Sequence, residues 1–490
     1  MDNMIRLVYN VVFTENPTLG TIKPTVKLFG FWSTDTTNDD GTVTTTSYHF
    51  TDSGYGGAGI TKIKIDGVVY TKDTMPVQSF NAYKFETEGL HTVEVDYTEL
   101  TSTAHMFRGC NALVSCDLTH CYIDDKFSLY YMFENCTNLI TAGDTSSDIV
   151  DFSMFELTST SANRAFFGCR KITEVNLDGC HITSLGGSLA FGDCVSLKKI
   201  SHKNGTIGYL PSSSAVTINS TNNFTSAIYY STGMSTHWLY NSISVEEIDF
   251  ENSIIPGQLT GVNTFPLVGT FGVFSNNGVQ ITPKLKKINL KNCDFSRIKI
   301  AMGLFIGGSY LTSIGPGAQY DVNIENVKFG NLIAAPAWFL STNMKKIHLG
   351  DVILGPLNTY PVNALLSPNL FGINGFCYTN DTPFFTQITT IKPVRNITLE
   401  EFSINLTDSA LNYGTGASQL STSCFFVKNI ACSKITIKGD LSALSDHPQL
   451  NNFIQFSSDV DGTFYYTHES TFDLLNINNI IPGNWTCVRI

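Results

Sequence analysis

Four cysteines stand at one position of a short repeated unit, and a thiol can bind a metal, exchange disulfides or pack as an apolar group. They are Cys110, Cys136, Cys169 and Cys194, out of 12 cysteines in the chain. Structural zinc sites use paired ligands such as Cys-x-x-Cys, and the sequence holds no such pair. Cysteine is among the most buried residue types. We therefore predict a buried ladder of thiols without a metal or cofactor, while disulfides stay open if the protein matures outside a cell.

No group of residues selects a reaction. The sequence contains no His-Glu-x-x-His, Walker or Gly-x-Ser-x-Gly motif. A glycan-cleaving enzyme needs two carboxylates that face each other at a fixed separation. Acidic pairs such as Asp39-Asp40 and Asp124-Asp125 lie in loop-like sequence, where solvation is expected. We predict that the chain has no catalytic residues.

Aromatic side chains gather in the long segment between Leu210 and Ser244. Binding contacts concentrate in such loops, so these rings either form a carbohydrate- or protein-binding patch or pack the insertion onto the rest of the chain. The candidate patch consists of Tyr229, Tyr230, Trp238 and Tyr240.

Lysine pairs recur at one register of a strand pattern, at 198–199, 286–287 and 345–346. One member of each pair should point outward. The resulting shallow positive stripe is interpreted as an aid to solubility and edge protection in preference to an anion site.

An internal repeat must position these residues. The unit Phe-x-(Gly/Asn/Asp)-Cys-x-x-(Leu/Ile) occurs four times, and its last residue opens a pattern apolar-x-x-apolar-x-apolar that recurs as far as residue 437. The Phe, Cys and Leu/Ile positions of the four units are Phe107, Cys110 and Leu113; Phe133, Cys136 and Leu139; Phe166, Cys169 and Ile172; and Phe191, Cys194 and Leu197.

The repeat predicts a solenoid of short stacked strands. No single unit can bury its own apolar side chains, but stacked strands share hydrogen bonds and one continuous core. Each Phe should stack on its neighbour in the next unit. The Gly, Asn or Asp before each Cys should turn the chain, because these residues tolerate left-handed backbone angles.

The Met-Phe-x-Gly-Cys-x-x-Leu pattern with its following Leu-x-x-Ile-x-Leu strand resembles the BspA-type leucine-rich repeat. The match is close over residues 106–200 and loose over 245–440, where long irregular insertions depart from the family pattern. The family includes bacterial surface proteins, some of them adhesive, and many proteins encoded by bacteriophages of gut bacteria. The resemblance implies a curved binding scaffold and no reaction.

The two ends lack the repeat. Asp66-Gly67 between β-rich runs predicts a hairpin. The expected fold is mainly β: an N-terminal antiparallel β-domain over 1–100, an irregular leucine-rich-repeat solenoid over 101–440, and a C-terminal β cap over 441–490. The N-terminal domain is either a cap that covers the exposed solenoid end or an attachment module.

Composition excludes several classes of protein. Only 15% of the 490 residues are charged, 42% are hydrophobic, and the net charge is −12. An acidic chain without clustered Lys and Arg does not suit nucleic acid. No apolar run reaches the roughly 18 residues of a membrane span. The alternating Ile5, Leu7 and Tyr9 favour a first strand over a secretory signal.

These observations predict a non-enzymatic structural or binding protein. The best specific hypothesis is a bacteriophage virion component, such as a fibre, a head decoration or a receptor-binding part, made in the host cytoplasm and located in the virion. Its partners would be other virion proteins or a host-surface protein or glycan. A homo-oligomer is compatible with the sequence, although no heptads specify one. A bacterial cell-surface adhesin is the main alternative, and a glycan-degrading enzyme is a third hypothesis.

Overall fold

The computed structural model divides the chain into two compact units, Met1–Ser201 and His202–Ile490. The fold is mainly β and contains a large mixed sheet. The residues that the structure describes are 3–37, 42–52, 55–76, 80–122, 127–155, 157, 160–184, 190–207, 239, 242–254, 259–260, 263–264, 267–268, 284, 286–295, 301–302, 319–324, 328–329, 343–349, 401–405, 433–442, 445 and 456–490.

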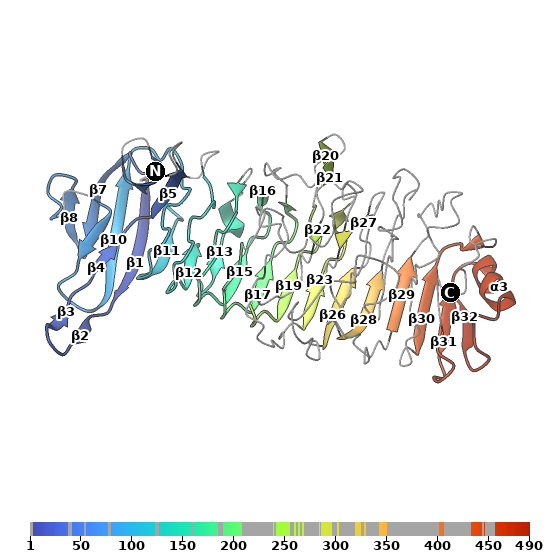
Figure 1. The fold of residues 1–490 in the computed structure, drawn as a ribbon. Coiled ribbons are helices and arrows are strands. Elements are labelled where there is room, and N and C mark those ends of the chain that lie inside the picture. The colour runs from blue at the N-terminus through green and yellow to red at the C-terminus, as the bar shows by residue number, and fades with distance from the viewer. Residues whose placement is uncertain are drawn as a thin grey trace. The chain divides into compact units, whose positions relative to one another are not determined.

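The first unit begins with an antiparallel sheet in the order β8 (Val68–Thr71), β7 (Ile60–Ile65), β10 (Gly89–Tyr97) and β1 (Met4–Val11) (Figure 1). Alternate side chains of β1 are buried, as expected for a strand with one face on a core. The predicted hairpin is confirmed. Asp66 and Gly67 join β7 to β8, and both have positive φ, which a tight two-residue turn of this kind requires.

Three two-stranded ribbons accompany this sheet. They pair β2 (Thr14–Asn16) with β3 (Gly20–Ile22), β4 (Thr25–Lys27) with β9 (Ala82–Lys84), and β5 (Phe31–Thr37) with β6 (Val43–His49), all antiparallel.

Short parallel strands follow in the same unit. They are β11 (Leu113–Asp117), β12 (Thr141–Gly143), β13 (Val150–Asp151), β15 (Glu174–Asn176) and β17 (Lys199–Ser201). Each pairs with the next, and the shared register places Cys116, Ala142, Val150, Val175 and Ile200 in one row. All five side chains are buried. A helical turn η1 (Ser153–Phe155) and the short parallel strands β14 (Thr160–Ser161) and β16 (His181–Ser184) complete the unit.

The N-terminal sheet covers the edge of the first parallel strand. β1 pairs antiparallel with β10 on one side and with β11 on the other, with Leu7 opposite Cys116. The edge of β11 that would otherwise expose unpaired backbone groups is therefore hydrogen-bonded. This arrangement is what the capping hypothesis for the N-terminal residues requires.

Parallel strands also build the second unit, in the order β19 (Glu247–Asp249), β23 (Lys287–Asn289), β26 (Gln319–Ile324), β28 (Asn343–Leu349), β29 (Glu401–Asn405), β30 (Lys434–Lys438), β31 (Thr463–Tyr466) and β32 (Thr486–Arg489) (Figure 1). One row runs through Ile248, Ile288, Val322, Ile347 and Phe402. The register therefore persists although the intervening segments differ in length. Shorter strands are β18 (Thr206–Ile207), β20 (Leu259–Thr260), β21 (Asn263–Thr264), β22 (Leu267–Val268), β24 (Asp294–Phe295), β25 (Ala301–Met302) and β27 (Lys328–Phe329).

Asparagines lie in three turns of the second unit, one near its start and two that follow β19 and β23. Asn204, Asn252 and Asn292 have φ values of 57°, 60° and 59°. Asn252 donates a 2.9 Å hydrogen bond from its amide to Asn204, and Asn292 donates one of 2.9 Å to Asn252. A residue type that tolerates the left-handed conformation therefore also links one turn to the next.

The C-terminal segment contains a helix that the sequence analysis, which expected a β cap, did not predict. α3 (Glu469–Ile477) lies between β31 and β32, and it buries Thr471 and Leu475, four residues apart on one face. Nearby, Trp485 is buried and donates its indole N–H to the carbonyl of Ser457 at 2.8 Å. Within the described residues, no helix has the length and apolar character needed to cross a membrane.

Two glycines of the first unit share a left-handed backbone but differ in the space around them. Gly109 and Gly143 have φ values of 75° and 87°. A Cβ added at Gly109 would meet no atom within 4 Å, whereas one added at Gly143 would lie 2.0 Å from the carbonyl oxygen of Asp151. We expect Gly109→Ala to lower the free energy of unfolding by about 1 kcal/mol, the cost of the left-handed backbone. Gly143→Ala should cost at least about twice as much, because β12 and β13 must separate. Equal losses in urea denaturation would contradict this assignment.

Candidate functional site

The twelve residues of the repeated units lie in the core of the first unit, and each is at most 1% exposed. The phenylalanine rings stack in sequence order. Ring centroids are 5.6 Å apart for Phe107 and Phe133, 5.7 Å for Phe133 and Phe166, and 5.9 Å for Phe166 and Phe191, with interplanar angles of 18°, 7° and 2°. The predicted stacking is confirmed. It also extends into the N-terminal segment, because Phe29 stacks on Phe107 at 6.1 Å.

The residue before each repeated cysteine has the left-handed backbone that the sequence predicts. Gly109, Asn135, Gly168 and Asp193 have φ values of 75°, 61°, 76° and 56°. These turns place the following thiol inside the core.

The four thiols are structural. Cys136 Sγ donates to the carbonyl oxygen of Phe107, and Cys169 Sγ does the same to Phe133, both at 3.0 Å. Cys194 Sγ reaches the carbonyl of Phe166 at 3.0 Å. Each of these three thiols is thus hydrogen-bonded to the phenylalanine of the unit before it. Burial raises the pKa of all four thiols. A low thiolate fraction suits neither nucleophilic nor metal chemistry.

Disulfides are absent from the described residues. The nine described cysteines form no disulfide, and the described part of the chain holds no group of three or more His, Cys, Asp and Glu side chains that could bind a metal ion. Cys377, Cys424 and Cys432 lie outside the described residues.

Thiol labelling measures this burial. We expect iodoacetamide at pH 8 to modify Cys121, which is partly exposed, and to spare Cys136 until denaturant is added. Peptide mass spectrometry would assign each modified site. Rapid native labelling of Cys136 would disprove the buried ladder.

The same burial predicts how stability depends on pH. Burial holds the pKa of the Cys136 thiol in the folded protein above the unfolded value of about 8.5, so the unfolded chain loses more protons as the pH rises past that value. The free energy of unfolding should therefore fall with rising pH in that range.

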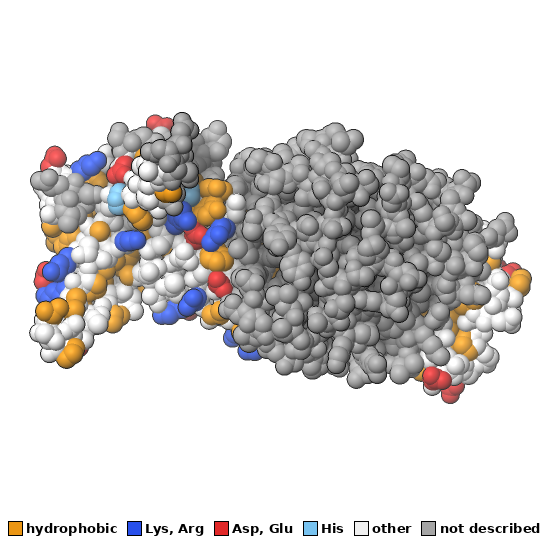
Figure 2. Space-filling model, in the orientation of Figure 1, with side chains coloured by type: hydrophobic (Ala, Val, Ile, Leu, Met, Phe, Trp, Pro, Cys, Tyr) orange, Lys and Arg blue, Asp and Glu red, His pale blue; other side chains and the backbone are white. Residues whose placement is uncertain are grey.

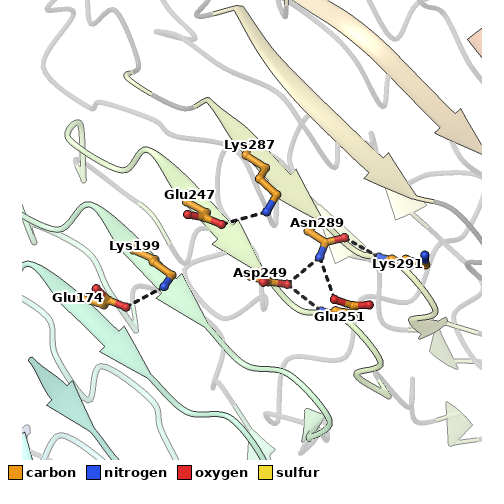
Figure 3. Close-up of polar contacts among 8 residues, drawn as sticks. All are labelled: Glu174, Lys199, Glu247, Asp249, Glu251, Lys287, Asn289 and Lys291. Carbon is orange, nitrogen blue, oxygen red and sulfur yellow. Dashed lines mark hydrogen bonds and ion pairs between the residues drawn. The ribbon is translucent and has the colours of Figure 1, made fainter. Parts of the chain in front are cut away.

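The predicted lysine stripe is not an unpaired positive surface (Figure 3). In the first unit Lys199 pairs with Glu174 on the neighbouring strand at 2.9 Å. In the second unit Lys286 pairs with Glu246 at 2.5 Å and Lys287 with Glu247 at 3.1 Å. Glu247 is the register partner of Lys287 on β19, and Glu246 immediately precedes that strand. Each cation meets a carboxylate one strand away, so the prediction of a positive stripe is wrong for these lysines. The side chains at 345–346 are outside the described part.

Tyr229, Tyr230, Trp238 and Tyr240, which the sequence analysis singled out as a binding patch, lie outside the described residues. A different aromatic cluster occurs in the first unit. It is built on the residues two positions before the Phe of the first three repeated units, which are His105, Tyr131 and Arg164.

These three residues form a second column beside the buried phenylalanines. The ring of His105 stacks on that of Tyr131 at 5.0 Å and 22°, and the guanidinium of Arg164 lies over Tyr131 at 5.6 Å. Backbone hydrogen bonds set the spacing, because His105 N donates to the carbonyl of Tyr130 and Tyr131 N to that of Asn163, both at 2.9 Å. Hydrogen-bonded stacking of the turns therefore brings side chains more than twenty residues apart into contact.

The β5–β6 hairpin extends the column. Trp32 stacks on His105 at 4.7 Å, lies at 5.8 Å from Tyr48, and meets the ring of Tyr55 edge-on at 5.3 Å. The base of the hairpin is hydrogen-bonded to the first turn, because Gly30 N donates to the carbonyl of Met106 at 2.7 Å.

A buried carboxylate joins two arginines at the other end of the column. Glu134 is only 1% exposed. Its Oε1 accepts from Arg164 Nη2 at 2.6 Å, and its Oε2 forms an ion pair with Arg108 Nε. The guanidinium of Arg108 also lies 4.9 Å from the centre of the Tyr131 ring, and that of Arg164 lies 4.2 Å from Phe167. Both arginine side chains remain 29% exposed.

We call this cluster the aromatic–guanidinium surface. On the visible face of the first unit, hydrophobic side chains lie among basic and acidic ones (Figure 2). The surface consists of Trp32, Tyr48, Tyr55, His105, Arg108, Tyr131, Glu134 and Arg164.

The backbone under this surface is strained. His105, Tyr131 and Arg164 have φ values of 60°, 53° and 50°, a region that bulky residues rarely adopt. Glycine or asparagine would occupy these positions at lower cost. Strained bulky residues in three successive units indicate that their side chains have a role at this place.

Unpartnered polar atoms gather here as well. Among the described residues, His105 Nδ1, Arg164 Nε and Oδ1 of Asn163, the neighbour of Arg164, are buried side-chain polar atoms without a hydrogen bond. Glu134 Oε2 has no hydrogen bond of normal geometry either, but it forms the ion pair with Arg108. Buried polar groups are normally satisfied, so a concentration of exceptions marks a functional candidate. Burial, together with the guanidinium of Arg108, lowers the pKa of His105 to about 4. The imidazole is therefore neutral at physiological pH.

Sequence reasoning missed this surface, although part of the signal was present. The positions two before and one after each repeated Phe carry His105 and Arg108, then Tyr131 and Glu134. Their periodicity places them on one side of the turns. Trp32 gave no such signal, because its place beside His105 depends on how the hairpin docks.

Comparison of the chain with models of protein families, with curated proteins and with solved structures gave no match.

Proposed function

We propose that the chain is a non-enzymatic leucine-rich-repeat solenoid that serves as a structural and binding component of a bacteriophage particle. The parallel register of β11 to β17, the stacked phenylalanines and the thiol ladder support a repeat scaffold in the first unit. The matching parallel rows of the second unit support its continuation. In such a scaffold each unit contacts its neighbours and leaves its turns free for binding.

The observation that carries the binding function is the aromatic–guanidinium surface. Tyr, Trp and Arg are the residue types that dominate binding hot spots. Here they are half-buried, stack on one another and lie on hydrogen-bonded turns and on the β5–β6 hairpin, so little side-chain freedom remains to be lost on binding. The assignment to a phage particle rests on the resemblance of residues 106–200 to BspA-type repeats.

Peptide mass spectrometry of gradient-purified phage particles, beside the envelope fraction of the host, tests this proposal. We expect peptides of this chain in the particles at a fixed ratio to the major capsid protein. The ratio would separate a head decoration, present in many copies, from a tail appendage, present in few. Peptides found only in the envelope fraction would overturn the virion assignment in favour of a cell-surface adhesin.

A further inference from the structure

The aromatic–guanidinium surface carries a net positive charge on an acidic protein. Arg108 and Arg164 share a single carboxylate, that of Glu134, and His105 is neutral, so one guanidinium charge is uncompensated within the cluster. The chain as a whole has a net charge of −12. The positive charge at this surface therefore comes from the cluster and not from the overall charge of the chain.

The arginines also retain unused donors. A guanidinium has five N–H donors. Toward Glu134, Arg108 uses Nε and Arg164 uses Nη2. These two contacts do not involve the Nη1 and Nη2 groups of Arg108 or the Nη1 group of Arg164. A planar carboxylate fits two such N–H groups side by side, and the charge-assisted bonds are strong.

Aromatic rings continue from this charged end. Tyr131 contacts both guanidinium groups, His105 lies next to it, and Trp32 follows with its own Tyr48 and Tyr55 neighbours. Stacking occupies ring faces within the column, and Trp32, His105 and Tyr131 each remain partly exposed. A ligand on this side would place its charged group at the arginines and an extended, hydroxyl-rich body along the rings.

We propose that this surface binds an acidic polysaccharide, with the carboxylate of a uronic or sialic acid held by Arg108 and Arg164 and the adjoining sugars lying along Tyr131, His105 and Trp32. The inference deepens the proposed function and rests on it. The uncompensated guanidinium charge favours a ligand with a carboxylate, and the partly exposed aromatic side chains beside it suit the rings of adjoining sugars.

Isothermal titration of the full chain tests the inference. The probes are polygalacturonate, polysialic acid, neutral dextran, dextran sulfate and polyglutamate. We expect binding to at least one of the two carboxylated polysaccharides, which thereby identifies the acid, and not to dextran. Raising the salt concentration should weaken it. Stronger binding to dextran sulfate would show a general anion site, and binding to polyglutamate alone would show a site for an acidic peptide. Either result overturns the proposal, as does the absence of binding.

Variants locate the site. Arg164→Gln should weaken binding at least about tenfold, as expected for the loss of a charged hydrogen bond. Arg170→Gln, an exposed arginine six residues further on, is the matched control and should bind normally. Glu134→Gln should strengthen binding, because it releases a guanidinium, even though it destabilises the fold. This opposite direction separates binding from folding. Unchanged affinity in both Arg164→Gln and Glu134→Gln would place the ligand elsewhere.

Failure of this inference and failure of the proposed function are distinguishable. Chain peptides at a fixed ratio in purified particles, without binding to polygalacturonate or polysialic acid, would retain the virion component and remove its ligand. Binding to one of these polysaccharides by a chain that is absent from the particles would retain the ligand and remove the virion assignment.

Discussion

Replacing Phe133 by alanine is expected to lower the free energy of unfolding by about 3–5 kcal/mol, the range measured for deleting a buried ring. Phe133 is fully buried, and it stacks on Phe107 on one side and on Phe166 on the other. The truncation therefore leaves a cavity in the middle of the stacked phenylalanines. It removes both stacking contacts and a tilted contact with Phe152. Neighbouring turns are hydrogen-bonded to each other, so they cannot close the gap without breaking their register.

Urea denaturation monitored by circular dichroism would measure the loss. Tyr122→Ala is the control, because that ring is 67% exposed and its removal should change stability by less than about 0.5 kcal/mol. A loss below about 1 kcal/mol for Phe133→Ala would mean that the stacked phenylalanines contribute little to holding successive units together.

Replacing Glu134 by glutamine should lower stability by about 3 kcal/mol, because it leaves two arginines without their shared counter-charge. Glu134 is buried while both guanidinium groups are only partly exposed, so water compensates for the loss incompletely. The variant keeps the shape of the side chain, which limits the effect to charge and hydrogen bonding. Added salt should recover part of the loss by screening the two like charges.

The control for Glu134→Gln is Glu174→Gln. Glu174 pairs with Lys199 at 2.9 Å, but 31% of its side chain is exposed, and such surface pairs contribute at most about 1 kcal/mol. Thermal or urea denaturation of both variants would compare them. Equal losses would show that the environment of Glu134 is not the low-dielectric one that its burial indicates.

Local sequence signals account for much of the first unit. The spacing of Phe107, Cys110 and Leu113, and its recurrence at Phe133, predicted buried stacked rings and left-handed turns, and the structure places them so. These features depend on contacts between equivalent positions, so one repeated pattern is enough to define them. The helix α3 was missed for the opposite reason. Of its apolar residues only Leu475 is buried, so packing of that side chain against the rest of the unit, and no repeated pattern, decides its conformation.

The lysine positions were predicted correctly from the sequence, but the positive surface charge inferred from them was not. Lysine pairs recur at one register, as the sequence indicated, but the charges of the pair at 286–287 are cancelled by glutamates forty residues earlier. A single strand does not reveal what its neighbour presents opposite it. Cross-strand pairing depends on which strands are adjacent, and that is a property of the assembled sheet.

By itself, the sequence determined a mainly β chain, a four-fold repeated core in residues 107–197 and the Asp66-Gly67 hairpin, because each follows from residue types at short, regular spacing. Only the tertiary structure decided that β1 seals the edge of β11, that Trp32 stacks on His105, and that Glu134 sits between two arginines. Such contacts join segments tens of residues apart, and their energies arise only when the turns are stacked and water is excluded. No local pattern encodes that geometry.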